Sequence, residues 1–125
     1  MIYLDTHIAE PLSRGHTRVL SREAARLLNR DRDIRISPMV VVEIEYLYEI
    51  GRLRVRASEI VAKLGSELGL RVCDRSFEEV AIQATHESWT RDVFDRMIVA
   101  QARLAKAVLI TRDTTIHANY DQARN

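Results

Sequence analysis

The chain has 125 residues, the usual size of one folded domain, and 46% of them are hydrophobic while 30% are charged. These proportions suit a globular protein, and apolar runs of only a few residues exclude a membrane span. The net charge of +1 does not indicate a nucleic-acid binder by itself, so any such contact must come from local arginines.

Cys73 is the only cysteine, which excludes a disulfide within the chain and a cysteine-rich zinc site. The first residues carry no basic region followed by a cleavable apolar segment, so we expect the protein in the cytoplasm. No repeat, linker or low-complexity segment interrupts the chain. We therefore expect a single domain over residues 1–125.

Short apolar runs predict strands at residues 2–4, 34–36, 70–73 and 107–111. Helical patterns separate these runs, and their expected N-caps are Ser21, Ser37, Ser58 and Ser76. The helix that follows Ser76 should bury Phe77. Strands that alternate with helices predict an α/β fold with a parallel sheet. Residues 117–125 are too polar to promise a full last strand.

The segment from residue 90 to 105 predicts a helix with one carboxylate in an unusual place. Phe94, Met97 and Ile98 begin a buried stripe at helical spacing. Asp95 shares a helix face with Ile98, Val99 and Ala102, so its side chain points along apolar surface. A carboxylate in that position must be paired, protonated or bound to a cation.

Four other acids are expected at the same edge of the sheet. Asp5 and Asp113 come directly after the first and last predicted strands, and Glu43 lies in the helix that follows the second. Asp92 precedes Asp95 by about one helical turn. Ligands of open parallel sheets bind beyond the carboxyl ends of the strands, so these acids should converge there.

Each acid also has a simpler explanation. Asp5 and Asp113 can be helix caps or turn formers, Asp92 can be a favourable acid at a helix start, and Glu43 can be a solvated surface residue. An ion pair with an arginine would account for Asp95. To explain the acids without a functional site, each of these separate explanations must be true at the same edge of the sheet.

Carboxylates crowded together repel one another unless a cation neutralises them. A set of oxygen ligands without histidine or cysteine selects a hard ion, Mg²⁺ or Mn²⁺. Such an ion can lower the pKa of a bound water and hold a phosphate oxygen. The chemistry predicted for this site is phosphodiester hydrolysis.

These residues resemble the PIN-domain ribonucleases, and in particular the VapC-type toxins of toxin–antitoxin pairs. The resemblance rests on four segments: Tyr3-Leu4-Asp5-Thr6, Ser37-Pro38 with Glu43, the block from Arg91 to Ala102, and Leu109-Ile110-Thr111-Arg112-Asp113. The sequence departs from the family pattern at Val93, where a proline is usual, and at Thr90, where a histidine is common. Both changes leave the acids intact.

The resemblance implies a three-layer α/β/α fold with a parallel sheet of four to five strands in the order 3-2-1-4-5. It implies Mg²⁺- or Mn²⁺-dependent cleavage of RNA. By position, the acidic residues are Asp5, Glu43, Asp95 and Asp113, with Asp92 as an accessory. Asp5, Asp95 and Asp113 are the implied metal ligands, and Glu43 would orient or deprotonate the attacking water.

The implied substrate contacts are Thr6 and Thr111, which could position water or phosphate, and Arg112, which could meet the RNA backbone. The implied partners are RNA, a cognate antitoxin protein and a second copy of the chain. We expect Tyr46, Leu47 and Tyr48 to form a protein-contact surface rather than a cofactor site. The histidines and Trp89 are expected to be ordinary surface or packing residues.

Two other functions compete with the nuclease assignment. A non-catalytic interaction module on the same scaffold is expected to lack one of the four acids, and none is missing here. A phosphoryl-transfer domain fits poorly, because a receiver needs an acidic pair after the first strand and a haloacid-dehalogenase type needs Asp-x-Asp. The residues after this strand are Asp5-Thr6-His7.

Overall fold

The computed structural model describes all residues, 1–125, and contains one five-stranded sheet. All neighbouring strands run parallel, in the order β3-β2-β1-β4-β5. The strands are β1 (Ile2–Leu4), β2 (Ile34–Ile36), β3 (Arg71–Val72), β4 (Val108–Ile110) and β5 (Ala123–Arg124). The predicted α/β class and strand order are confirmed.

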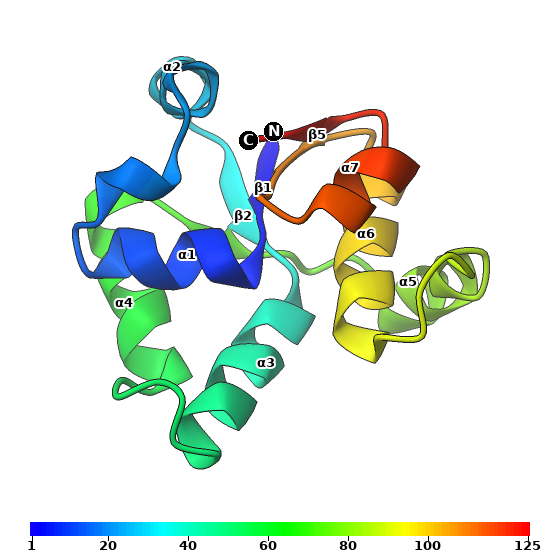
Figure 1. Cartoon of the computed structure of the whole chain (residues 1–125), viewed down its shortest axis with the longest axis horizontal. Coiled ribbons are helices and arrows are strands. Elements are labelled where there is room, and N and C mark those ends of the chain that lie inside the picture. The colour runs from blue at the N-terminus through cyan, green and yellow to red at the C-terminus, as the bar shows by residue number, and fades with distance from the viewer.

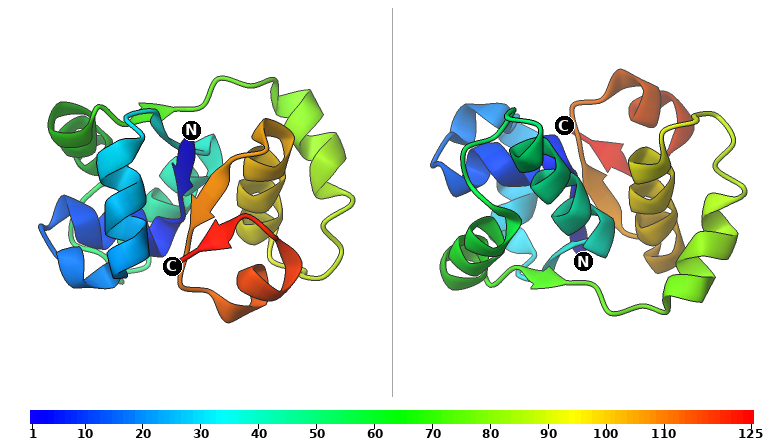
Figure 2. Two further views of the ribbon diagram at one scale, coloured as in Figure 1. Left: turned by 90° about the horizontal axis from the view of Figure 1, so that it is seen from above. Right: turned by 90° about the horizontal axis from the view of Figure 1, so that it is seen from below.

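Helices connect the strands and cover both faces of the sheet (Figure 1). They are α1 (Thr6–Ser13), the 3₁₀ turn η1 (Thr17–Val19), α2 (Arg22–Arg30), α3 (Pro38–Glu49), α4 (Ala57–Leu68), α5 (Phe77–Ala84), α6 (Val93–Ala105) and α7 (Thr114–Asn119). Figure 2 shows α1, α2 and α4 on one side of the sheet and α5 and α6 on the other. The result is a three-layer α/β/α arrangement.

The central strands explain why such short segments hold the fold together. Every residue of β1 is buried, and β4 buries Leu109 and Ile110. Parallel sheets covered on both faces need apolar residues on both sides of each strand, which these continuous runs supply. In the register, Ile2 of β1 lies between Ile34 of β2 and Val108 of β4.

Two expectations about the helices were wrong. Ser58 does not cap α4, because the helix already begins at Ala57. The N–H of Ala57 donates to the Glu45 carboxylate at 3.1 Å. Phe77 is 68% exposed, because the buried side of α5 is formed by Val80 and Ala84. The caps expected at Ser21, Ser37 and Ser76 are present.

The fifth strand forms despite its polar composition. The N–H of Thr111 donates to the carbonyl of Arg124 at 2.8 Å, and Leu109 donates to Gln122 at 3.1 Å. Main-chain hydrogen bonds of this kind do not depend on side-chain type, so an apolar run was not required. The longest helix has 13 residues, and none combines the length and hydropathy needed to cross a bilayer.

Candidate active site

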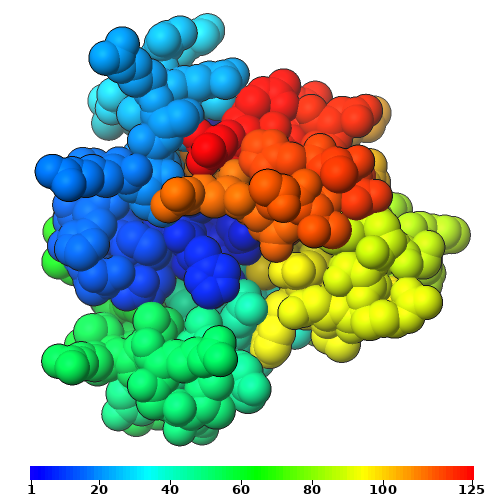
Figure 3. All heavy atoms as spheres, viewed as in Figure 1, coloured from blue at the N-terminus to red at the C-terminus, as the bar shows by residue number.

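In the space-filling view, the start of α1 (blue), α3 (teal), the start of α6 (yellow) and the segment after β4 (orange) come together around the carboxyl edge of the sheet (Figure 3). Asp5, the residue after β1, lies at this edge and is only 5% exposed. Its Oδ1 accepts the N–H of Thr6 at 2.8 Å, and its Oδ2 accepts the hydroxyl of Thr111 at 2.7 Å. Both carboxylate oxygens are therefore held in place by their neighbours.

Thr111 and Asp113 follow β4 and meet Asp5 from the adjacent strand. Thr111 is fully buried, and its Oγ1 also accepts the N–H of Asp113 at 3.1 Å. Asp113 caps α7, because its Oδ1 accepts the N–H groups of Thr115 and Ile116. One threonine hydroxyl thus connects the carboxylate of Asp5 to the main chain of Asp113.

Glu43 reaches the same region from the second turn of α3. Its Oε1 accepts a short hydrogen bond from the hydroxyl of Thr6, the residue that follows Asp5. Thr6 is fully buried, so this contact fixes α1 against α3 beside Asp5. The start of α3 is anchored separately, because Ser37 caps the helix and donates to the side chain of Gln101 at 2.9 Å.

Asp92 and Asp95 come from the start of α6. Asp92 is exposed and caps the helix by accepting the N–H of Asp95 at 3.0 Å. Asp95 is half-buried, and its own carboxylate makes no hydrogen bond within the protein. The apolar face that it shares is real, since Ile98, Val99 and Ala102 are all buried.

The electrostatics show that these carboxylates act on one another. Burial and the negative charges of the other four acids, Asp92, Asp5, Asp113 and Glu43, raise the pKa of Asp95 to about 7. Burial also raises the pKa of Asp5 and of Glu43, although the hydrogen bonds from the threonines oppose it. The five predicted acids therefore belong to one electrostatic unit.

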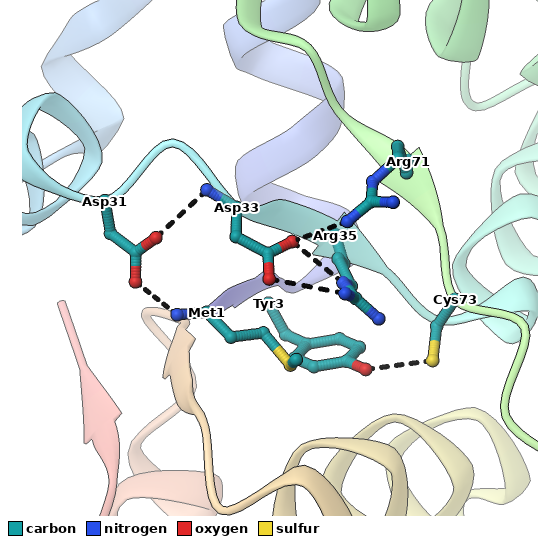
Figure 4. Close-up of polar contacts among 7 residues, drawn as sticks. All are labelled: Met1, Tyr3, Asp31, Asp33, Arg35, Arg71 and Cys73. Carbon is teal, nitrogen blue, oxygen red and sulfur yellow. Dashed lines mark hydrogen bonds and ion pairs between the residues drawn. The ribbon is translucent and has the colours of Figure 1, made fainter.

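No arginine neutralises this unit. None of the ion pairs in the structure includes any of the five acids. A second polar cluster gives the contrast (Figure 4): Asp33 pairs with Arg35 and Arg71 at 2.9 and 3.0 Å, and the Tyr3 hydroxyl donates to Cys73. There, the hydrogen bond from Arg35 holds the pKa of Asp33 below its usual value.

The donor set fits a hard divalent cation in chemical type. It offers carboxylate oxygens, and Asp95 carries no protein donor. No three acidic, histidine or cysteine side chains, however, lie close enough together to hold an ion as they stand. Mutual repulsion among the carboxylates favours this separation.

The capping explanation and the site explanation are compatible. Asp5, Asp92 and Asp113 each use one oxygen to cap a helix, which the simpler explanation of the sequence expected for Asp5 and Asp113. A cap fixes the carboxylate and places a helix N-terminus beside it, where anions are favoured. Capping is therefore the means by which the chain holds three acids at one edge.

Other predicted residues lie as follows. Arg112 is exposed next to Thr111 and has no polar partner in the protein, so its guanidinium is free. Tyr46 is 48% exposed on α3. Leu47 is buried, so the expectation that Leu47 belongs to a contact surface was wrong. Trp89 packs against the core, as expected.

Sequence reasoning missed two histidines at this site, which were expected to be ordinary surface residues. A ring nitrogen of His117 lies 2.7 Å from the carbonyl oxygen of Thr111. The spacing of four residues from Asp113 was a signal for this, because it places both on one side of a helix. His7 acts electrostatically on both Asp5 and Glu43; its position two residues after Asp5 was the signal for that.

Residues 2–122 match the family model for the PIN domain. The chain belongs to the PIN domain family. PIN domains are in general nucleases, which agrees with an acidic site at the carboxyl edge of the sheet. A comparison with curated protein sequences found no match to this PIN domain.

Solved structures share the fold of this PIN domain. A toxin–antitoxin complex from Klebsiella pneumoniae is similar with a TM-score of 0.65 and 19% sequence identity, over 100% of this chain and 97% of that one. VapBC2 from Rickettsia felis, bound to a DNA fragment from its promoter, gives a TM-score of 0.61 and 21% identity, over 94% and 92% of the chains. At this level of identity, the comparison establishes the architecture.

Proposed function

We propose that this PIN domain, spanning residues 1–125, is a divalent-metal-dependent endoribonuclease and the toxin of a type II toxin–antitoxin pair. The observation that carries the proposal is that four acids at the carboxyl edge of the sheet, together with burial, raise the pKa of Asp95, and that none of these five acids forms an ion pair. The toxin assignment is supported by the similar structures, which are toxin–antitoxin complexes.

In this proposal, Asp5, Asp95 and Asp113 would hold Mg²⁺ or Mn²⁺. The bound ion would supply Lewis acidity and neutralise negative charge on the phosphate. Asp95 is suited to this task because its carboxylate has no protein donor, while Asp5 is pre-oriented by Thr6 and Thr111. Asp92 adds negative charge at the rim of the site and orders the first turn of α6.

Glu43 is the proposed acceptor of a proton from the attacking water. Burial raises the pKa of its carboxyl, which makes the carboxylate a better base than an ordinary surface glutamate. Thr6 orients it through the hydrogen bond to Oε1. Water would then attack phosphorus in line, and the products would be a 5′-phosphate and a 3′-hydroxyl.

Arg112 is the proposed contact to the RNA backbone, because its exposed guanidinium stands beside the acids and can pair with a phosphate. Thr6 and Thr111 would position the reacting groups through the carboxylates that they bind. A cytoplasmic location remains part of the proposal.

The further partners we propose are a cognate antitoxin and a second copy of the chain. An exposed apolar stripe on α3 supports protein contacts of this kind: Val42, Tyr46 and Ile50 are each about half exposed at helical spacing. Val93 at the start of α6 is 63% exposed as well.

The test is cleavage of a labelled single-stranded RNA by the purified protein in Mn²⁺, with and without a chelator. We expect cleavage that needs the metal, leaves 5′-phosphate ends and is abolished by Asp95→Asn. Equal cleavage by the D95N variant, or cleavage that persists in chelator, would refute the assignment.

A non-catalytic interaction module is the second candidate. The exposed stripe on α3 and the absence of a pre-arranged ion site favour it. The two candidates differ in their response to metal, because only a protein that binds the ion in its folded state gains stability from it.

A further inference from the structure

His7 occupies a position at the acidic site that the proposed catalytic roles do not use. It is the second residue of α1, two residues after Asp5, and its side chain is exposed. Its charge interacts favourably with both Asp5 and Glu43. His7 directly follows Thr6, whose N–H and hydroxyl donate to Asp5 and Glu43, so the exposed imidazole stands beside both acids.

His7 is not a structural partner of these acids. Thr6 and Thr111 donate to the carboxylate of Asp5, and Thr6 donates to Glu43, but His7 makes no hydrogen bond to either. Two other histidine rings have partners within the protein: His117 contacts the Thr111 carbonyl and His16 contacts Arg14. The His7 ring thus has a free N–H in a region dominated by negative charge.

That arrangement suits an anionic ligand that approaches the acids from outside. The five carboxylates repel a phosphate diester, and a hydrogen-bond donor beside them offsets part of this repulsion. An imidazole carries a ring N–H in its neutral form and two in its cationic form, so it can donate to a phosphate oxygen in either state. Arg112 is the other exposed donor beside the acids.

We propose that His7 is a substrate-contacting residue, whose ring N–H donates to a non-bridging oxygen of an RNA phosphate adjacent to the scissile one. This inference rests on the proposed nuclease function. It assigns His7 to binding of the RNA backbone and predicts no dependence on base identity, because phosphate oxygens are the same at every nucleotide.

The experiment compares four proteins in steady-state cleavage of one single-stranded RNA in Mn²⁺: wild type, His7→Ala, His7→Asn and His86→Ala. His86 is exposed beyond α5, outside the acidic site, and serves as the matched control. A hydrogen bond to a charged group is worth enough to change affinity about tenfold. We expect H7A to raise KM about tenfold with kcat within about twofold of wild type.

The asparagine variant retains a side-chain N–H and should recover part of the lost affinity, whereas H86A should match the wild type. Stabilisation by Mn²⁺, followed as a shift in Tm, should be the same in all four proteins. A wild-type KM in H7A would overturn the inference. So would loss of Mn²⁺ stabilisation in H7A, because His7 would then act on the metal site rather than on RNA.

Failure of the proposed function gives a different pattern. If wild type and H86A do not cleave RNA, the nuclease assignment falls and the inference about His7 falls with it. If both cleave and H7A is indistinguishable from them, only the inference about His7 is wrong.

Discussion

The Thr111 hydroxyl donates to Oδ2 of Asp5 at 2.7 Å, across the ends of two paired strands. Both residues are buried, and each lies one position beyond the last residue of its strand. The parallel pairing of Leu4 with Ile110 sets this distance, so sheet register itself orients the first acid of the site.

Replacing Thr111 by valine, which has nearly the same shape, tests this contact. The T111V variant loses the donor to Asp5 and the acceptor for the Asp113 N–H, so we expect a loss of about 1–3 kcal/mol in unfolding free energy. Urea denaturation measures it. Thr111→Ser keeps the hydroxyl and should lose less; equal losses in both variants would show that the methyl group matters instead.

The ionised carboxylate of Asp95 should lower the unfolding free energy of the metal-free protein. Its carboxylate is half-buried among four like charges, so Asp95→Asn should stabilise the metal-free protein at pH 8 by about 1–2 kcal/mol, reduced from the full linkage value by solvent screening. The comparison is thermal or urea unfolding in chelator. Asp74→Asn, at an exposed residue outside any ion pair, is the control; a destabilised D95N would contradict the account.

The same group gives stability a pH dependence with a definite sign. The pKa of Asp95 is raised to about 7, so the folded state binds more protons than the unfolded state, and stability falls as the pH rises toward 8. Asp31, Asp33 and Glu45 have lowered pKa values, so they affect stability only at lower pH.

We therefore expect the Tm in chelator to decrease between about pH 5 and pH 8 and then to level off. Differential scanning calorimetry across this range measures the trend. The D95N variant should show a weaker decrease. A Tm that rises with pH over this interval would contradict the predicted direction.

A partly buried ion pair fixes the loop that leads to Asp92. Glu87 is 2% exposed and accepts a hydrogen bond from Arg103 at 2.7 Å, while Arg103 also stacks on Tyr120. Arg103→Met leaves a buried carboxylate unpaired and should cost about 2–4 kcal/mol in unfolding free energy. The double variant with Glu87→Gln should recover part of this loss, and additive losses would argue against a direct pair.

Sequence patterns predicted the elements that depend on local chemistry. Ser21, Ser37 and Ser76 cap helices as expected, and the apolar runs of β1 and β4 form the centre of the sheet. The predicted cap at Ser58 was wrong because the carboxylate of Glu45, from α3, accepts the N–H of Ala57 at the start of α4. The predicted burial of Phe77 was wrong because a capping signal does not indicate which side of a helix packs against the core.

In the acidic site, too, features set by local sequence were predictable and features set by tertiary contacts were not. The common edge of Asp5, Glu43, Asp95 and Asp113 could be predicted, because strand ends in a parallel sheet share one edge. The contacts that orient them could not, since the bonds from Thr111 to Asp5 and from Thr6 to Glu43 join residues 106 and 37 positions apart. The hydrogen bond of His117 to Thr111 and the electrostatic effect of His7 on Asp5 likewise depend on three-dimensional placement.

The most direct measurement of the central claim is a thermal-shift titration of wild type and D95N with Mn²⁺ at pH 7.5. The account predicts a Tm that rises with Mn²⁺ concentration in the wild type, by mass action on the folded state, and little or no rise in D95N. An unchanged Tm in the wild type, or an equal rise in D95N, would show that these acids do not form a cation site.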